Sequence, residues 1–197
     1  RAVVQKASPL VDKLGNKVLD DTLTLYDDPT LPLTPGSRRC DDEGVVSRQV
    51  CLVEGGIVSS FLYDLQTAAQ AGVESTGSAH RGLASMPGPA PSVLVLVEGE
   101  ASEEEMLAEV KHGLVVQHPL GAGQSNVLGG EFSANVLLGY LVKNGKIEGR
   151  VKNTLVSGNV YTVLAKIRGV GKDSRWVGGT VRTPALCCDG VSVATKG

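Results

Sequence analysis

Apolar and polar positions alternate in several short stretches of the chain, each bounded by glycine, proline, asparagine or aspartate. Such alternation predicts β-strands with one buried face. Glu54-Gly55-Gly56 and Asn144-Gly145 separate pairs of these stretches, and both predict tight hairpin turns because their residues accept positive φ. The predicted strands are Val18–Leu25, Val45–Val53, Ile57–Leu62, Leu114–Val116, Phe132–Val142, Ile147–Val156 and Val191–Ala194.

Three helices are predicted from residues that cap helix ends. In the second, Ser102 and Glu105 have the spacing of a capping box, and three glutamates in the first turn suit the helix dipole. His112 near its end is expected to interact with the same dipole. The predicted helices begin at Asp64, Ser102 and Asn159 and end at Gly72, Gly113 and Gly169.

Runs of strands interrupted by single helices, without β-α-β alternation, predict an α+β fold with a largely antiparallel sheet. The length of 197 residues suits one large domain or one and a half small ones, and we expect one β-rich domain over residues 1–197 with a few short helices. Residues 74–91 are rich in Ser, Gly and Pro and have no periodicity. This segment is either a functional loop or a disordered one.

Charge and hydropathy exclude some classes of partner. The net charge is −2 and no basic cluster is present, so we expect no nucleic-acid partner. The longest nearly apolar run, Ser92–Val97, is far shorter than the roughly 20 residues that cross a bilayer, so we expect no membrane contact. No secretory leader is recognisable at the start. The four cysteines are two single residues, Cys40 and Cys51, and one adjacent pair, Cys187 and Cys188. They indicate reduced thiols and a cytoplasmic location.

Motifs that would identify a chemistry by themselves are absent from the sequence. The glycines around Gly121 and Gly129 match neither a dinucleotide-binding nor a P-loop spacing. They are expected either to let backbones pass closely or to form a peptide-binding edge. The sequence has no H-E-x-x-H helix, and its three histidines predict surface or packing roles rather than a zinc site.

Other reactive residues also fit structural roles. Asp41-Asp42-Glu43 precedes a glycine and a strand, which favours a turn that binds its own backbone amides over acid–base catalysis. Ser133 lacks a G-x-S-x-G context, and the Cys187-Cys188 pair has no histidine nearby in sequence. A thiol hydrolase remains an alternative that alkylation of the cysteines would test.

The order of several short motifs resembles the C-terminal domain of the TldD/PmbA family, some members of which are called modulators of DNA gyrase. Each motif is weak, but their order and spacing together are specific. They are Ser8–Gly15, Asp41–Gly44, Ser75–Gly77, Gly113–Val116, Gly130–Ser133, Gly139-Tyr140, Asn144-Gly145, Gly158-Asn159 and Val170-Gly171.

This resemblance implies a cytoplasmic metallopeptidase complex of two kinds of subunit. In TldD-type members, zinc is held by an H-E-x-x-x-H helix upstream of this region and by a cysteine near the C-terminus. That cysteine would fall between Asp173 and Pro184, where this chain has none. The chain is therefore more similar to the PmbA (TldE) branch, which lacks the metal. We expect no cofactor in this chain, and zinc in a TldD-type partner.

The resemblance further implies that the chain contacts an unfolded peptide substrate and pairs with a TldD-like subunit or with itself. The expected substrate-binding residues are Arg81 in the long loop and Gly129, Gly130, Glu131, Phe132 and Ser133. No catalytic or metal-binding residue is expected. The alternative is a non-catalytic assembly domain whose strands only join subunits.

Overall fold

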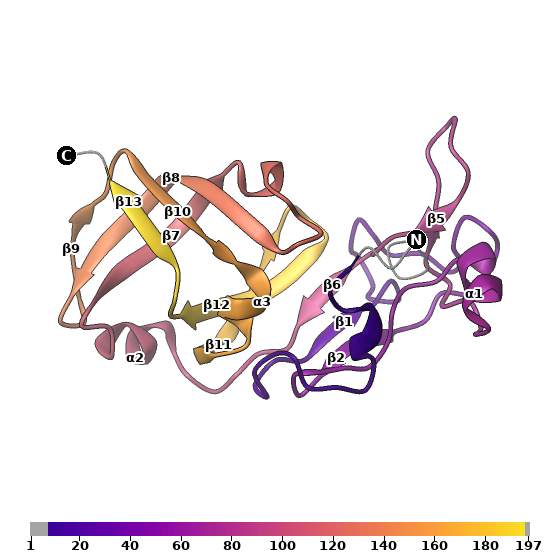
Figure 1. The fold of residues 1–197 in the computed structure, drawn as a ribbon, viewed down its shortest axis with the longest axis horizontal. Helices are drawn as coiled ribbons and strands as arrows, with labels where there is room; N and C mark the ends of the chain where they lie inside the picture. The colour runs from indigo at the N-terminus through magenta and orange to yellow at the C-terminus, as the bar shows by residue number, and fades with distance from the viewer. Residues whose placement is uncertain (1–7, 196–197) are drawn as a thin grey trace. The chain divides into compact units, whose positions relative to one another are not determined.

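The computed structural model describes residues 8–195 and divides the chain into two compact units, each considered by itself. The first contains Arg1–Glu98 and Ser174–Pro184, and the second contains Gly99–Asp173 and Ala185–Gly197. Strands predominate over short helices, as Figure 1 shows, so the predicted α+β class is confirmed.

The strands of the first unit form a twisted sheet and a small hairpin (Figure 1). The sheet order is β11-β12-β6-β1-β2-β3; β12 pairs with β6 in parallel, and β1 pairs antiparallel with β6 and β2. The elements are η1 (Val11–Lys13), β1 (Leu25–Asp27), β2 (Val50–Glu54), β3 (Ile57–Val58), α1 (Leu65–Ala71), β4 (Ala79–His80), β5 (Gly88–Pro89) and β6 (Leu94–Leu96).

The second unit is built on the 13-residue strand β8, which pairs with β7 along one edge and with β10 and β9 along the other. Alternate residues of β8 face inward, and Ala134 and Val136 pack with Val156 of β10 as its core. The elements of this unit are α2 (Glu103–Ala108), β7 (His112–Leu120), η2 (Ala122–Gln124), β8 (Glu131–Lys143), β9 (Lys146–Arg150), β10 (Thr154–Asn159), α3 (Val160–Leu164) and β13 (Ser192–Thr195). Strands β11 (Ile167–Val177) and β12 (Val181–Cys188) are divided between the units, with Ser174–Pro184 in the first.

The predicted helix starts and hairpin turns are confirmed. The Asp64, Ser102 and Asn159 side chains each accept a backbone N–H at the start of a helix, and the first two complete capping boxes. Asn144 and Gly145 both have positive φ between β8 and β9, as a type I′ turn requires. Local hydrogen-bonding chemistry therefore fixes these boundaries.

Two predicted helix ends were wrong. Helix α2 ends at Ala108, and Gly113 and His112 lie in β7 instead of the last helical turn. Helix α3 ends at Leu164, and Gly169 lies in β11. These glycines let neighbouring side chains pack closely against the backbone. A Cβ at Gly113 would lie 2.9 Å from Val110 Cγ1, and a Cβ at Gly169 would lie 3.1 Å from Met106 Sδ.

Two predicted strands were also misplaced. Val18–Leu25 is mostly a turn, since the Asp20 carboxylate accepts the Thr22 N–H and hydroxyl, and β1 begins only at Leu25. Ile147–Val156 is two strands, β9 and β10, separated near Asn153, whose φ is +48°. The 74–91 segment contains the short β4–β5 hairpin and several buried residues.

Candidate functional site

The acidic turn Asp41-Asp42-Glu43 binds backbone amides, as the sequence predicted. Asp41 Oδ1 accepts the N–H groups of Glu43 (3.0 Å) and Val45 (2.9 Å) within the turn itself. Its second oxygen accepts the N–H of Ala79 at 2.9 Å, across 38 residues of sequence. The buried Asp41 carboxylate thus fixes strand β4 in addition to its own turn.

The next carboxylate positions the expected substrate-binding residue Arg81. Asp42 Oδ2 accepts the Arg81 N–H at 2.8 Å, and the Asp42 N–H donates to the Ala79 carbonyl at 3.2 Å. The Arg81 side chain is exposed. Its backbone is therefore held at the base of the β4–β5 hairpin while its guanidinium is free to contact a ligand.

The hairpin encloses an open hollow of about 600 Å³. Asp42 and Arg81 supply charge at its base, and Leu83 and Met86 are exposed near its tip at 112% and 75%. The hollow combines a cation, a carboxylate and apolar side chains. Such a surface can contact an extended peptide without selecting one side chain.

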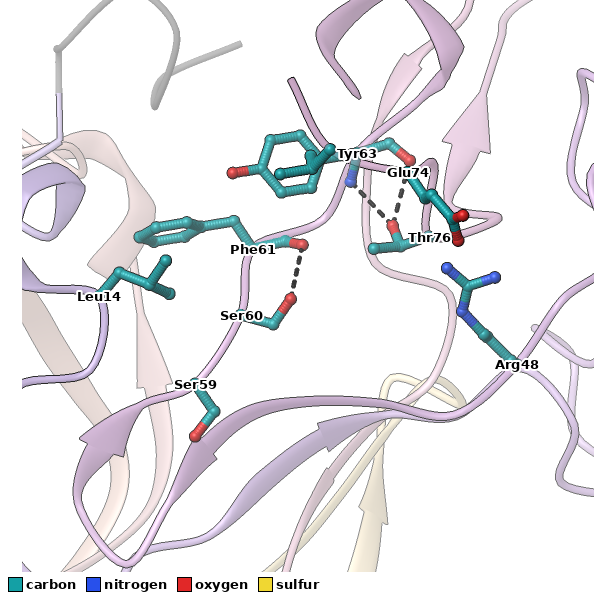
Figure 2. A pocket seen from close by; sticks show the side chains of 9 residues that line it. Leu14, Arg48, Ser59, Ser60, Phe61, Tyr63, Glu74 and Thr76 are labelled. Carbon is teal, nitrogen blue, oxygen red and sulfur yellow. Dashed lines mark hydrogen bonds between the residues drawn. The ribbon is translucent and has the colours of Figure 1, made fainter. Parts of the chain in front are cut away.

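A second, smaller hollow of about 250 Å³ lies beside helix α1 and was not predicted from sequence. Figure 2 shows Leu14 and Phe61 on one side of it and Arg48 and Glu74 on the other. Arg48 Nη2 donates to the Ser75 carbonyl at 2.6 Å, which orients the guanidinium. The volume suits one or two side chains rather than a drug-sized ligand. No sequence motif marks this hollow, because its lining comes from four separate segments.

The five expected residues from Gly129 to Ser133 lie in the second unit. Glu131, Phe132 and Ser133 pair with Asn159, Gly158 and Ser157 of β10, so one edge of this segment is already occupied. The outer strands of this sheet are β7 and β13. Strand β7 ends at Leu120, which pairs with Asn135 of β8. A peptide could add to β7 or β13, the outer strands of the sheet.

The glycine pair itself has a packing role. Gly130 has φ +80°, and a Cβ there would lie 2.5 Å from the Tyr161 ring. The Asn159 amide donates to the Gly129 carbonyl at 2.8 Å and to Glu131 Oε1 at 2.9 Å. These contacts join the start of β8 to the start of α3. Gly130 thus needs to be glycine whether or not a peptide binds nearby.

The described residues do not fit a self-contained zinc site. A protein zinc site usually has at least three ligands, and no three His, Cys, Asp or Glu side chains in residues 8–195 are grouped to hold an ion. Burial raises the pKa of the Cys187 thiol and raises that of Cys188 to about 11, which disfavours the thiolate that a nucleophilic reaction requires.

Comparisons with known proteins find similarity over almost the whole chain. The family model for the PmbA/TldA metallopeptidase C-terminal domain matches residues 1–195. The metalloprotease TldD homolog of Haemophilus influenzae is 30% identical over 203 residues, covering 96% of this chain and 42% of that protein. No helix in residues 8–195 has the length and apolar content needed to span a membrane.

Solved structures show the same fold. The crystal structure of TldE from Thermococcus kodakarensis superposes with a TM-score of 0.89 at 32% identity, covering 98% of this chain and 44% of that one. A Thermotoga maritima protein described as a modulator of a DNA gyrase has a TM-score of 0.87 at 37% identity, with 97% and 44% covered. The chain spans less than half the length of each of these relatives.

Proposed function

Because the chain belongs to the PmbA/TldD metallopeptidase family, we propose that it acts as a PmbA (TldE)-like subunit of a two-subunit peptidase. In this proposal a TldD-like partner carries zinc, and this chain shapes the cleft that holds an unfolded peptide. The absence of a cysteine between Asp173 and Pro184 supports the assignment to the metal-free branch. The similarity to TldE supports it as well.

The hollow at the β4–β5 hairpin is the observation on which this proposal depends most. The two carboxylates Asp41 and Asp42 fix the backbone around Arg81, so the exposed side chain extends from a backbone that is held in place. A side chain on a fixed backbone loses less conformational entropy on binding than one on a mobile loop. It can bind peptide carbonyls or carboxylates whatever the rest of the sequence is.

The proposal is tested with the complex of the full-length protein and its TldD-like partner from the same cell. Arg81→Ala is expected to raise the KM for an unfolded peptide about tenfold, with the complex still assembled. Arg39→Ala is the matched control, because this exposed arginine of the same unit lines neither hollow. Metal analysis of each subunit alone should place zinc in the partner.

Two outcomes would contradict the proposal. Stoichiometric zinc bound by this protein alone would place it in the metal-carrying branch. A TldD-like partner that cleaves peptides equally well alone and in the complex would favour a pure assembly role for this chain.

We place the complex in the cytoplasm, which agrees with four cysteines that form no disulfide in the described structure.

A further inference from the structure

The hollow beside helix α1 has charged side chains on one wall and apolar side chains on the other (Figure 2). Arg48 and Glu74 form the charged wall, and Leu14 and Phe61 form the apolar wall. Val73 is a further apolar residue of the lining, and the enclosed volume is about 250 Å³. A ligand in this hollow would therefore contact a cation, a carboxylate and an apolar surface at once.

The cation of this hollow is oriented by the backbone. Arg48 Nη2 donates to the Ser75 carbonyl at 2.6 Å, and neither Nη1 nor Nε donates to another described residue. Ser75 is itself buried, and its hydroxyl donates to the Tyr63 carbonyl at 3.1 Å. The guanidinium is therefore held by a fixed carbonyl while two of its nitrogen atoms keep N–H donors for a ligand. A carboxylate is the group that best matches such donors.

The carboxylate of the hollow has no partner among residues 8–195. Glu74 is exposed, and neither a hydrogen bond nor an ion pair joins its side chain to another described residue. It forms no ion pair with Arg48, although both side chains line the same hollow. Two opposite charges arranged in this way can each bind the complementary group of one small ligand. The matching ligand carries both a carboxylate and an ammonium group.

The apolar wall has room for a side chain of the ligand. Leu14 and Val73 remain half exposed, at 54% and 49%. The segments on either side of the hollow are joined, since Thr76 Oγ1 accepts the Tyr63 N–H at 2.8 Å and the Thr76 N–H donates to the Tyr63 carbonyl at 3.1 Å. The hollow is thus preformed, which reduces the entropy cost of binding. Burial of its apolar residues favours a ligand with an aliphatic or aromatic side chain.

We propose that this hollow binds a free α-amino acid with an apolar side chain, such as leucine. The carboxylate of the ligand contacts Arg48, and its ammonium group contacts Glu74. Its side chain packs against Leu14, Phe61 and Val73. The volume of about 250 Å³ suits one such molecule and lies below the range of drug-sized ligands. The proposal does not depend on the peptidase role, because that role uses the other hollow, at the β4–β5 hairpin.

A ligand-observed NMR titration of the full-length protein tests the site. Leucine is expected to bind with a dissociation constant on the order of 1 mM, which is typical of a ligand with roughly nine non-hydrogen atoms. N-acetylleucine lacks the ammonium group and leucinamide lacks the carboxylate, so each should bind about tenfold more weakly than leucine. Serine lacks the apolar side chain and should also bind about tenfold more weakly.

Two variants assign the contacts to residues. Arg48→Gln should raise the dissociation constant for leucine about tenfold and abolish the preference for leucine over leucinamide. Glu74→Gln should raise it by about the same factor and abolish the preference for leucine over N-acetylleucine. Arg39→Gln and Glu54→Gln are the matched controls, because these exposed residues line neither hollow. Circular dichroism shows whether each variant is folded.

The following results would overturn the proposal: no saturable binding of leucine up to about 10 mM, wild-type affinity in both folded variants, or equal affinities for leucine and its two derivatives. Tighter binding of N-acetylleucine than of leucine would assign the hollow to the C-terminus of a peptide and would also contradict it. If a variant does not fold, the series of ligands on the wild-type protein still decides between these outcomes.

Discussion

At the scale of single residues, glycine answers two different requirements in this chain. Gly72 ends helix α1 in the left-handed region, where a side chain would be strained and no atom lies close. Gly171 has ordinary φ but lies against the Ala185 backbone, where a Cβ would be 3.2 Å from its carbonyl oxygen. Gly130 combines both requirements, since it has positive φ and faces Tyr161.

Gly130→Val should therefore destabilise the protein instead of only blocking a cleft. We expect the free energy of unfolding to fall by roughly 2–4 kcal/mol, from backbone strain and from displacement of the Tyr161 ring. Urea denaturation followed by circular dichroism measures it. Gly149→Val is the control, because a Cβ at Gly149 meets no atom within 4 Å and its φ is not positive. Equal stability of the two variants would contradict the packing role.

The cysteines differ in expected reactivity for a physical reason. Burial raises the pKa of Cys188 to about 11, so its thiolate is scarce near pH 7.5, whereas Cys40 is exposed. Iodoacetamide should label Cys40 at least about tenfold faster than Cys188 in the native protein, as mass spectrometry of peptides would measure. Fast labelling of Cys188 accompanied by loss of peptide cleavage would revive a thiol hydrolase.

At the scale of elements, the parts that local chemistry determines could be predicted from the sequence. The caps at Asp64 and Ser102 and the Asn144-Gly145 turn each depend on residues within four positions. The β11–β12 hairpin was missed, because its turn at Gly178-Gly179 follows polar, aperiodic residues and its pairing is decided by distant strands. The register between strands that are distant in sequence cannot be deduced from a local pattern.

The same difference between local and distant contacts decides how much of the candidate site could be predicted. The sequence and its family resemblance indicated Arg81, but the Asp42–Arg81 hydrogen bond joins residues 39 positions apart. The buried pairing of Asp27 with Ser92 and Val93 spans 65 and 66 positions. Such contacts exist only in the folded chain, so neither the hollow nor the buried contacts of Asp27 had a signal in the sequence.

Helix α2 offers a test at this scale. Ser102→Ala removes the hydroxyl that accepts the Glu105 N–H at 3.1 Å and should cost about 1 kcal/mol. Hydrogen bonds from the Ser102 N–H and then from its hydroxyl lower the pKa of Glu105, so the stabilisation from the hydroxyl–carboxylate bond is complete above the ordinary glutamate pKa and is lost as pH falls through the lowered value. Urea unfolding of both proteins across acid pH would show their stability difference shrinking to the part due to the Glu105 N–H bond, which does not titrate; a constant difference would contradict this.

At the scale of the whole molecule, the net charge argues against DNA binding. One relative is described as a modulator of a DNA gyrase, a description that could suggest such binding. The sequence has a net charge of −2 and no long basic run, so we expect no binding to duplex DNA even at 50 mM salt, a concentration at which phosphate contacts are strong. Fluorescence anisotropy with a labelled duplex measures this. A micromolar dissociation constant that weakens steeply with salt would show that the prediction is wrong.

The route of the chain through its two units limits how the protein can be dissected. The first unit is completed by Ser174–Pro184, which returns to it after the chain has built most of the second. A fragment that stops at Glu98 would lose β12 and leave the outer side of β6 without its parallel neighbour. Such a bare strand invites self-association. Separate expression of the first unit would require a covalent graft of the returning hairpin onto the N-terminal piece.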